Sequence, residues 1–296
     1  MSAGPPGSSW GNPAAAPAHA NSTRGVRLRE ILGGRAFAYV IVIGSAAAIV
    51  GGAVLGSPAV MAGGPVAVGA VALALAFATA DRRSERDFFH AYAAARGLVY
   101  EGTIEPFPLT PLLSAGDRRR CDHWTRTPPG SDRQIALGHY TYEVRDRDEH
   151  GRLERHETRH FTICVVDLEA GIRMFPAVFL CRRGVFGLLA RADWLSHVNR
   201  HEVELESAAL SERYELWVDD AQDDVLLGEL FTPSFEVLLA EHPLVPCFEY
   251  RAGTLVVYVD RRLSDEGHLD WLREVTAKVA DRFATEVAEA STAHGH

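Results

Sequence analysis

Hydrophobic residues are distributed very unevenly along this 296-residue chain. Residues 36–80 contain no charged side chain, a run about twice as long as one membrane crossing requires. A turn signal, Gly56-Ser57-Pro58, divides this run into two apolar segments of about 20 residues each. The pattern predicts a transmembrane helical hairpin, with helices over 36–55 and 59–80.

The remaining sequence mixes the periodicities of helices and strands. A helix is predicted from Ser84 to Gly97, continuing the second apolar helix. From Gln134, alternating apolar and polar residues predict a long β-hairpin that turns at 148–151. Further predicted strands are MFPAVFLC, VELES, SERYELWV and the hairpin FEYRAGTLVVYV, and further predicted helices are VFGLLARADWLS, TPSFEVLLAEHP and HLDWLREVTAKVADRF.

Because these elements do not follow a strict βαβ order, we expect an α+β domain with mainly antiparallel strands. Residues 103–133 receive no assignment. The chain is thus predicted to have four parts: a disordered tail with a basic end (1–35), the hairpin (36–80), an α+β domain (81–286) and a disordered C-terminal tail (287–296).

Arginines flank the predicted hairpin on both sides, and its central turn carries no charge. Positive residues next to membrane spans are retained in the cytoplasm, so both termini and the soluble domain are predicted to be cytoplasmic. The same side chains could bind the headgroups of anionic membrane lipids. They are Arg24, Arg27, Arg29, Arg35, Arg82, Arg83 and Arg86.

Small residues recur every four positions in both predicted spans. This spacing lets helices pack closely, either within the hairpin or between copies of the chain. The residues are Gly44, Ala48, Gly52 and Gly56 in the first span, and Ala70, Ala74 and Ala78 in the second.

Charge and composition exclude several functions. The net charge of −9 divides into +3 on residues 1–35 and −12 on residues 81–296, which disfavours nucleic acid as a partner. The chain has 29 arginines and one lysine, Lys278, so a phosphate-binding loop or a Schiff base has no lysine in a suitable position. We expect no cofactor, and the four widely spaced cysteines suit reduced, packed thiols.

The segment HETRH, from His156 to His160, matches the HExxH signature of zinc peptidases. In that signature a helix brings both histidines to one zinc ion, and the glutamate activates water. The alternating residues around the segment instead predict a β-strand, which would hold the two histidines about 13 Å apart. A metal site of His156, Glu157 and His160 is therefore disfavoured but kept as an alternative.

Two other clusters have simpler explanations. Cys121 and His123 could form a metal site with His139 or Cys181, but nothing in the sequence brings these residues together. The acidic run VDDAQDD, residues 218–224, lacks the glycine and the final glutamate of a calcium loop. Acidic residues that begin a helix explain this run better.

The order of hairpin and soluble domain resembles an uncharacterised bacterial family of membrane-hairpin proteins with a cytoplasmic domain of unknown function. The resemblance covers residues 36–285 loosely and 180–262 best, through Glu206-Ser207, Asp219-Asp220 and Leu230 to Pro233. It implies a fold and a location in the bacterial inner membrane, but no reaction.

We therefore expect an integral membrane protein whose cytoplasmic domain binds another protein or a second copy of itself. The alternatives are a membrane-tethered, metal-dependent hydrolase that uses HETRH, and a sensor of lipid or pH. No feature of the sequence identifies an enzyme.

Overall fold

The computed structural model describes residues 32, 35–147, 153–168, 175–183, 200–205, 207–240 and 243–293. The chain divides into two compact units, residues 1–88 and 89–296. Each is described by itself below.

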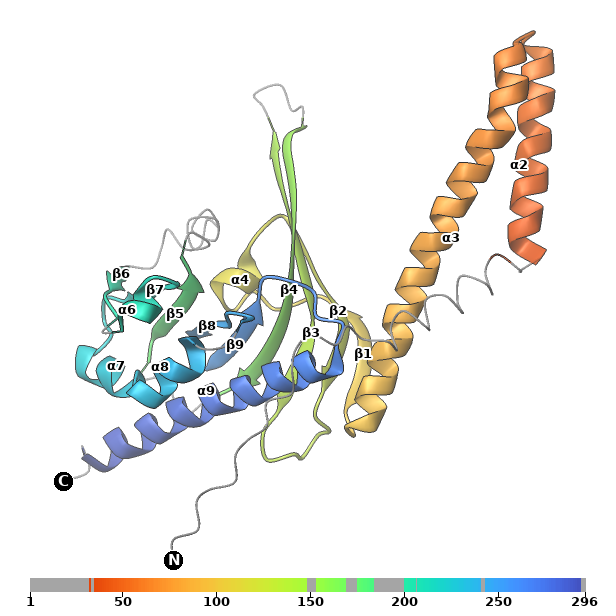
Figure 1. Cartoon of the computed structure of the whole chain (residues 1–296). Helices are drawn as coiled ribbons and strands as arrows, with labels where there is room; N and C mark the ends of the chain where they lie inside the picture. Colours follow the sequence, from red (N-terminus) through yellow and green to blue (C-terminus); the bar gives the residue numbers. More distant parts are fainter. Residues whose placement is uncertain are drawn as a thin grey trace, which may run out of the picture. The chain divides into compact units, whose positions relative to one another are not determined.

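The first unit contains two helices, α2 (Arg35–Val54) and the N-terminal part of α3 (Pro58–Ala95), joined by a turn in which Gly56 has a φ of 62° (Figure 1). The two helices pack closely through small residues. A Cβ added at Gly44 would lie 2.7 Å from Cγ1 of Val68, and one added at Gly64 would lie 2.7 Å from Cβ of Ala48. Only glycine permits this approach of the two backbones.

The second unit is built on a nine-stranded sheet in the order β1-β2-β3-β4-β9-β8-β5-β7-β6. Every neighbouring pair is antiparallel, as the sequence predicted. The strands are β1 (Val99–Ile104), β2 (Arg118–Arg126), β3 (Ile135–Arg147), β4 (Leu153–Asp167), β5 (Ala177–Arg182), β6 (Arg200–Val203), β7 (Tyr214–Asp219), β8 (Cys247–Arg251) and β9 (Thr254–Val259).

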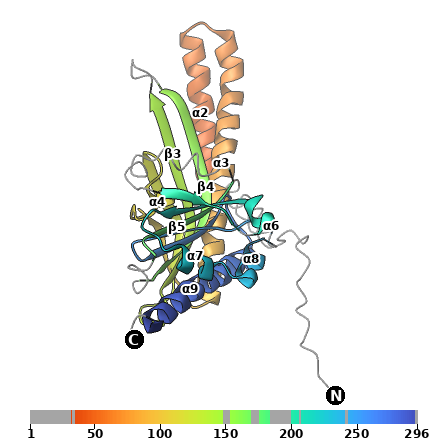
Figure 2. The same cartoon turned by 90° about the vertical axis from the view of Figure 1, so that its left-hand side faces the viewer.

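Five described helices accompany the sheet: α4 (Pro111–Ser114), α6 (Ala208–Ser211), α7 (Asp224–Leu230), α8 (Pro233–Ala240) and α9 (Glu266–Ala293). Helix α9 lies along one face, and β3 and β4 extend beyond their neighbours (Figures 1 and 2). The predicted apolar stripe of α9, Leu272, Val275, Val279 and Phe283, is buried. This helix continues to Ala293, beyond the domain end expected at residue 286.

Most predicted elements of the second unit are present. The long hairpin is formed by β3 and β4, and the second hairpin turns at Ala252 and Gly253, both with positive φ, as a tight two-residue turn requires. The helix predicted between Ser84 and Gly97 is the end of α3. The turn expected at 148–151 and the helix expected over VFGLLARADWLS lie outside the described residues.

One strand prediction was misplaced. The sequence placed a strand over VELES, residues 203–207, whereas β6 ends at Val203. Ser207 instead caps α6, because its hydroxyl accepts a hydrogen bond from the Leu210 amide at 3.4 Å. The unassigned residues 103–133 contain all of β2, all of α4 and the end of β1.

Candidate functional site

The HETRH segment lies within strand β4. Its residues pair with β3, His156 opposite Arg145 and His160 opposite Thr141. Nδ1 of His160 lies 3.1 Å from the Thr141 hydroxyl, and Glu157 forms an ion pair with Arg159. A strand rises about 3.3 Å per residue, so the two histidines do not reach one ion as they would on a helix.

Substitution of His156 by alanine tests this conclusion. We expect the zinc content of the purified protein, measured by elemental analysis, to be the same for the wild type and His156→Ala. Stoichiometric zinc that is lost in the variant would contradict the strand geometry.

The cysteine and histidine candidates do not form a metal centre. All four cysteines are buried and reduced, and burial raises the pKa of Cys164 to about 11 and that of Cys247 to about 12. The rings of His123 and His139 have centroids 5.9 Å apart, and Nε2 of His139 contacts the carbonyl of Leu263 at 2.9 Å. Among the described residues no three His, Cys, Asp or Glu side chains are grouped to hold a metal ion.

The acidic run VDDAQDD begins helix α7, as predicted. The carboxylate of Asp223 accepts hydrogen bonds from the amides of Val225 and Leu226 at 2.8 and 3.4 Å. Asp219 accepts from the Ala221 amide at 2.9 Å. Asp223 therefore caps α7, whereas Asp219 stabilises the turn that precedes it.

The candidate membrane residues that the structure describes lie on α2, on α3 or in the turn between them. Arg82, Arg83 and Arg86 are exposed on α3, whereas Arg24, Arg27, Arg29 and the side chain of Arg35 lie outside the described residues. Gly44 and Ala48 face α3. Gly52 is buried, and Gly56 forms the turn. Ala70, Ala74 and Ala78 are exposed, while Ala72 and Ala76 on the same helix are buried.

Large apolar side chains are exposed along both helices. Helix α3 is long and apolar enough to cross a membrane, with a mean hydropathy of 2.1 over its most apolar window, of which 12% is buried. The apolar part of α2, Tyr39–Val54, is shorter. Of the side chains that the structure describes between residues 39 and 77, fourteen large apolar ones are exposed: Tyr39, Val40, Val42, Ile43, Ile49, Val50, Val54, Leu55, Val60, Val66, Val71, Leu73, Leu75 and Phe77. Water does not favour so extensive an apolar surface, which is typical of a membrane-embedded or partner-covered segment.

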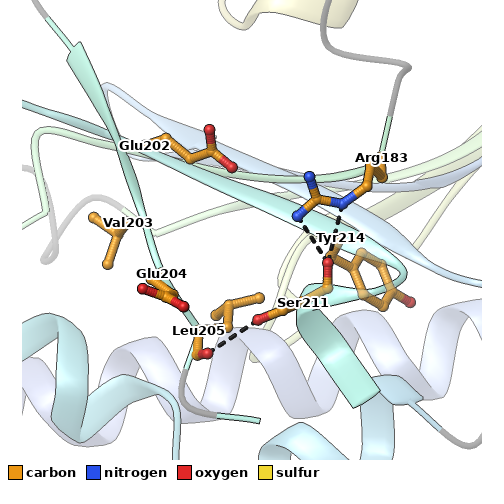
Figure 3. Close-up of a pocket in the computed structure, with 7 residues that line it drawn as sticks. All are labelled: Arg183, Glu202, Val203, Glu204, Leu205, Ser211 and Tyr214. Carbon is orange, nitrogen blue, oxygen red and sulfur yellow. Dashed lines mark hydrogen bonds between the residues drawn. The ribbon is translucent and has the colours of Figure 1, made fainter. Parts of the chain in front are cut away.

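In the second unit, two clefts adjoin the edge strand β6. The first, about 350 Å³, is lined by Arg183, Glu202, Val203, Glu204, Leu205, Ser211 and Tyr214. Figure 3 shows Glu202 and Val203 on the strand, Glu204 directly after it, and Arg183 beside Ser211 across the pocket. The guanidinium of Arg183 donates two hydrogen bonds to the Ser211 carbonyl, at 2.8 and 3.0 Å, and is thereby held in place.

The second cleft, about 360 Å³, lies between β6 and helices α7 and α8. It is lined by His201, Glu202, Val203, Glu204, Leu205, Leu216, Leu227, Gly228, Phe231 and Glu236. The two clefts share residues 202–205 and together form what we call the β6 groove. Its apolar lining includes Val203, Leu227 and Phe231, and its carboxylates are Glu202, Glu204 and Glu236.

The β6 groove borders the backbone of an edge strand. Among the described residues, β6 pairs with β7 alone, and it ends the strand order. In an antiparallel edge strand, alternate residues direct their N–H and C=O groups away from the sheet. The groove therefore combines an apolar floor, acidic side chains and outward hydrogen-bonding groups, and this combination was not visible in the sequence.

A third cleft, about 530 Å³, lies near the other sheet edge. Its charged lining residues balance: Arg118, Arg119 and Arg120 against Glu105, Asp117 and Glu143. Ion pairs already involve Arg120 with Asp122 at 3.0 Å and Glu143 with Arg145 at 2.7 Å. This cleft has neither the excess charge nor the apolar floor of the β6 groove.

Comparisons with known proteins do not assign a family. No protein-family model and no curated protein matches the chain. A solved structure that is similar is the "crystal structure of the mycobacterial trehalose monomycolate transport factor A, TtfA". It matches with a TM-score of 0.44 and 10% sequence identity, over 68% of this chain and 94% of that chain. A likeness at this level assigns neither a function nor a partner.

Proposed function

We propose that this chain is a two-span membrane protein whose soluble α+β domain binds a protein partner at the cytoplasmic face of the membrane. The protein acts by holding its partner in place rather than by chemistry. The observation that carries this proposal is the joint presence of exposed apolar helices in one unit and the β6 groove in the other.

The apolar side chains support membrane insertion. Burying one large apolar side chain contributes roughly 1.5–3 kcal/mol. Thirteen of the fourteen exposed residues named above lie on α2 and α3, and Leu55 lies in the turn between the two helices. Arg82, Arg83 and Arg86 follow this apolar part of α3 directly, where positive residues mark the cytoplasmic side. With both helices spanning, the turn at residues 55–57 lies on the opposite side.

Cysteine labelling tests this topology. The four native cysteines are buried, so we expect a maleimide to label only a single cysteine that is introduced at an exposed position. We expect Ser57→Cys to react with a membrane-impermeant maleimide on intact cells, and Asp132→Cys to react only after the membrane is opened. Labelling of Asp132→Cys on intact cells would contradict the proposed orientation, and release of the protein by alkaline carbonate would contradict insertion.

Protein binding is supported by the chemistry of the described clefts. Cys164 and Cys247 are buried and their pKa values are raised, and the HETRH residues are spread along a strand. Among the described residues, no three His, Cys, Asp or Glu side chains are grouped to hold a metal ion. The β6 groove instead provides the features of a peptide-binding edge: an apolar floor with polar groups around it.

Co-purification tests the binding function. We expect the full-length protein, extracted from membranes in mild detergent, to retain a partner near stoichiometry, as quantified by mass spectrometry. A chain ending at residue 97 keeps both long helices and serves as the control. Retention of the same partner by this truncated chain would assign binding to the helices and contradict the proposal.

A further inference from the structure

We propose that the β6 groove binds an extended, basic segment of a partner protein, which adds to the sheet as a strand beside β6. This inference deepens the proposed function and rests on it, because it specifies the partner that the domain holds.

The edge position of β6 supplies the first argument. Residues 200–203 pair with 216–219 of β7 in regular antiparallel register. The opposite side of β6 presents its alternate N–H and C=O groups away from β7. An extended peptide satisfies these groups by forming the same ladder, which is a recurring mode of peptide recognition.

Charge supplies the second argument. Glu202 and Glu204 are exposed, and within the described part of the chain neither forms an ion pair. Arg183, the one arginine among the described lining residues, is committed to the Ser211 carbonyl. The groove therefore favours a positively charged occupant.

Spacing supplies the third argument. Glu202 lies on β6, and Glu204 directly follows the last strand residue, Val203. Opposite residues of paired strands lie on the same face. A strand that runs beside β6 and past its end would meet the two glutamates with two side chains that are also two residues apart. The residue between these two then points to the other face of the sheet. On that face Val203 lies with Leu227 of α7 and with Phe231, the C-cap residue of that helix. The expected motif is Lys or Arg, an apolar residue, then Lys or Arg.

Selection from a displayed library of random short peptides tests this inference, with full-length protein in lipid nanodiscs as the target. We expect enrichment of the basic–apolar–basic motif, and we expect Glu202→Lys/Glu204→Lys to weaken a synthetic peptide of this pattern about tenfold. The matched control is Glu105→Lys/Asp132→Lys, which makes the same change of charge at exposed residues near β1 to β3 and should bind normally.

The backbone ladder has its own test. Methylation of every second peptide nitrogen removes the donors of one strand edge, so one of the two alternate methylation patterns should abolish binding while the other is tolerated. Equal binding of both patterns would exclude strand addition. Enrichment without basic residues, no enrichment, or unchanged affinity in Glu202→Lys/Glu204→Lys would overturn the inference, while the co-purified partner would still decide the proposed function separately.

Discussion

Replacement of Glu249 by glutamine is expected to stabilise the protein by roughly 3 kcal/mol at about pH 8. Glu249 lies on β8 and is 1% exposed, and Oε2 of its carboxyl group accepts a hydrogen bond from the Leu112 amide at 2.8 Å. Burial raises its pKa from 4.5 to about 7. An amide keeps an acceptor for Leu112 without the cost of a buried charge.

The direction of the pH dependence follows from the raised pKa. Protonated Glu249 suits the folded state, so the wild type loses stability as the pH rises from about 4.5 to about 7 and then levels off. Urea unfolding at a series of pH values measures this loss, which should be absent in Glu249→Gln. Glu289→Gln, at an exposed position on α9, is the control. Identical pH profiles for Glu249→Gln and the wild type would show that Glu249 does not carry the effect.

Truncation of Phe283 to alanine is expected to cost about 3–5 kcal/mol of folding free energy. Phe283 projects from α9 into an aromatic cluster, with ring centroids 5.0 Å from Phe175, 6.0 Å from Phe248 and 4.8 Å from Tyr250. The smaller side chain leaves a cavity between the helix and the sheet, which the surrounding rings fill only in part.

Denaturant unfolding followed by tryptophan fluorescence measures this cost. Thr285→Ala, two residues along the same helix and exposed, should change stability by less than about 0.5 kcal/mol. A loss in Phe283→Ala no larger than that of Thr285→Ala would mean that α9 does not pack on the sheet as described.

Local patterns were sufficient to predict the elements whose neighbours in sequence are also their neighbours in space. The alternation over residues 135–167 predicted β3 and β4 because these strands pair with each other. In the same way, Ala252 and Gly253 identified the turn between β8 and β9.

The region of β1 and β2 could not be predicted because its alternation is interrupted. The pairing of β1 with β2 shifts at Gly102, and that of β2 with β3 shifts between Asp122 and Thr125. His123, within the second irregularity, has a φ of 58°. Each interruption moves the following side chains to the opposite face, which hides the period of two.

The β6 groove was also beyond local patterns. Its parts come from β6, β7, α6, α7, α8 and the end of β5, and only the sheet order places β6 at an edge. The alternating acidic residues of VELES predicted a strand over residues 203–207. In the structure β6 ends at Val203, and Ser207 is the N-cap of α6.

Photocrosslinking in native membranes tests whether the β6 groove binds a partner protein, with a photoreactive amino acid in place of Val203 in the full-length chain. We expect one dominant adduct with a partner protein in the membrane fraction, and we expect Glu202→Lys/Glu204→Lys to suppress it. A photoreactive residue in place of Asp132 should not give this adduct. Equal adducts at both positions, or an adduct that persists after charge reversal, would contradict the account of a membrane-anchored domain that binds its partner through the β6 groove.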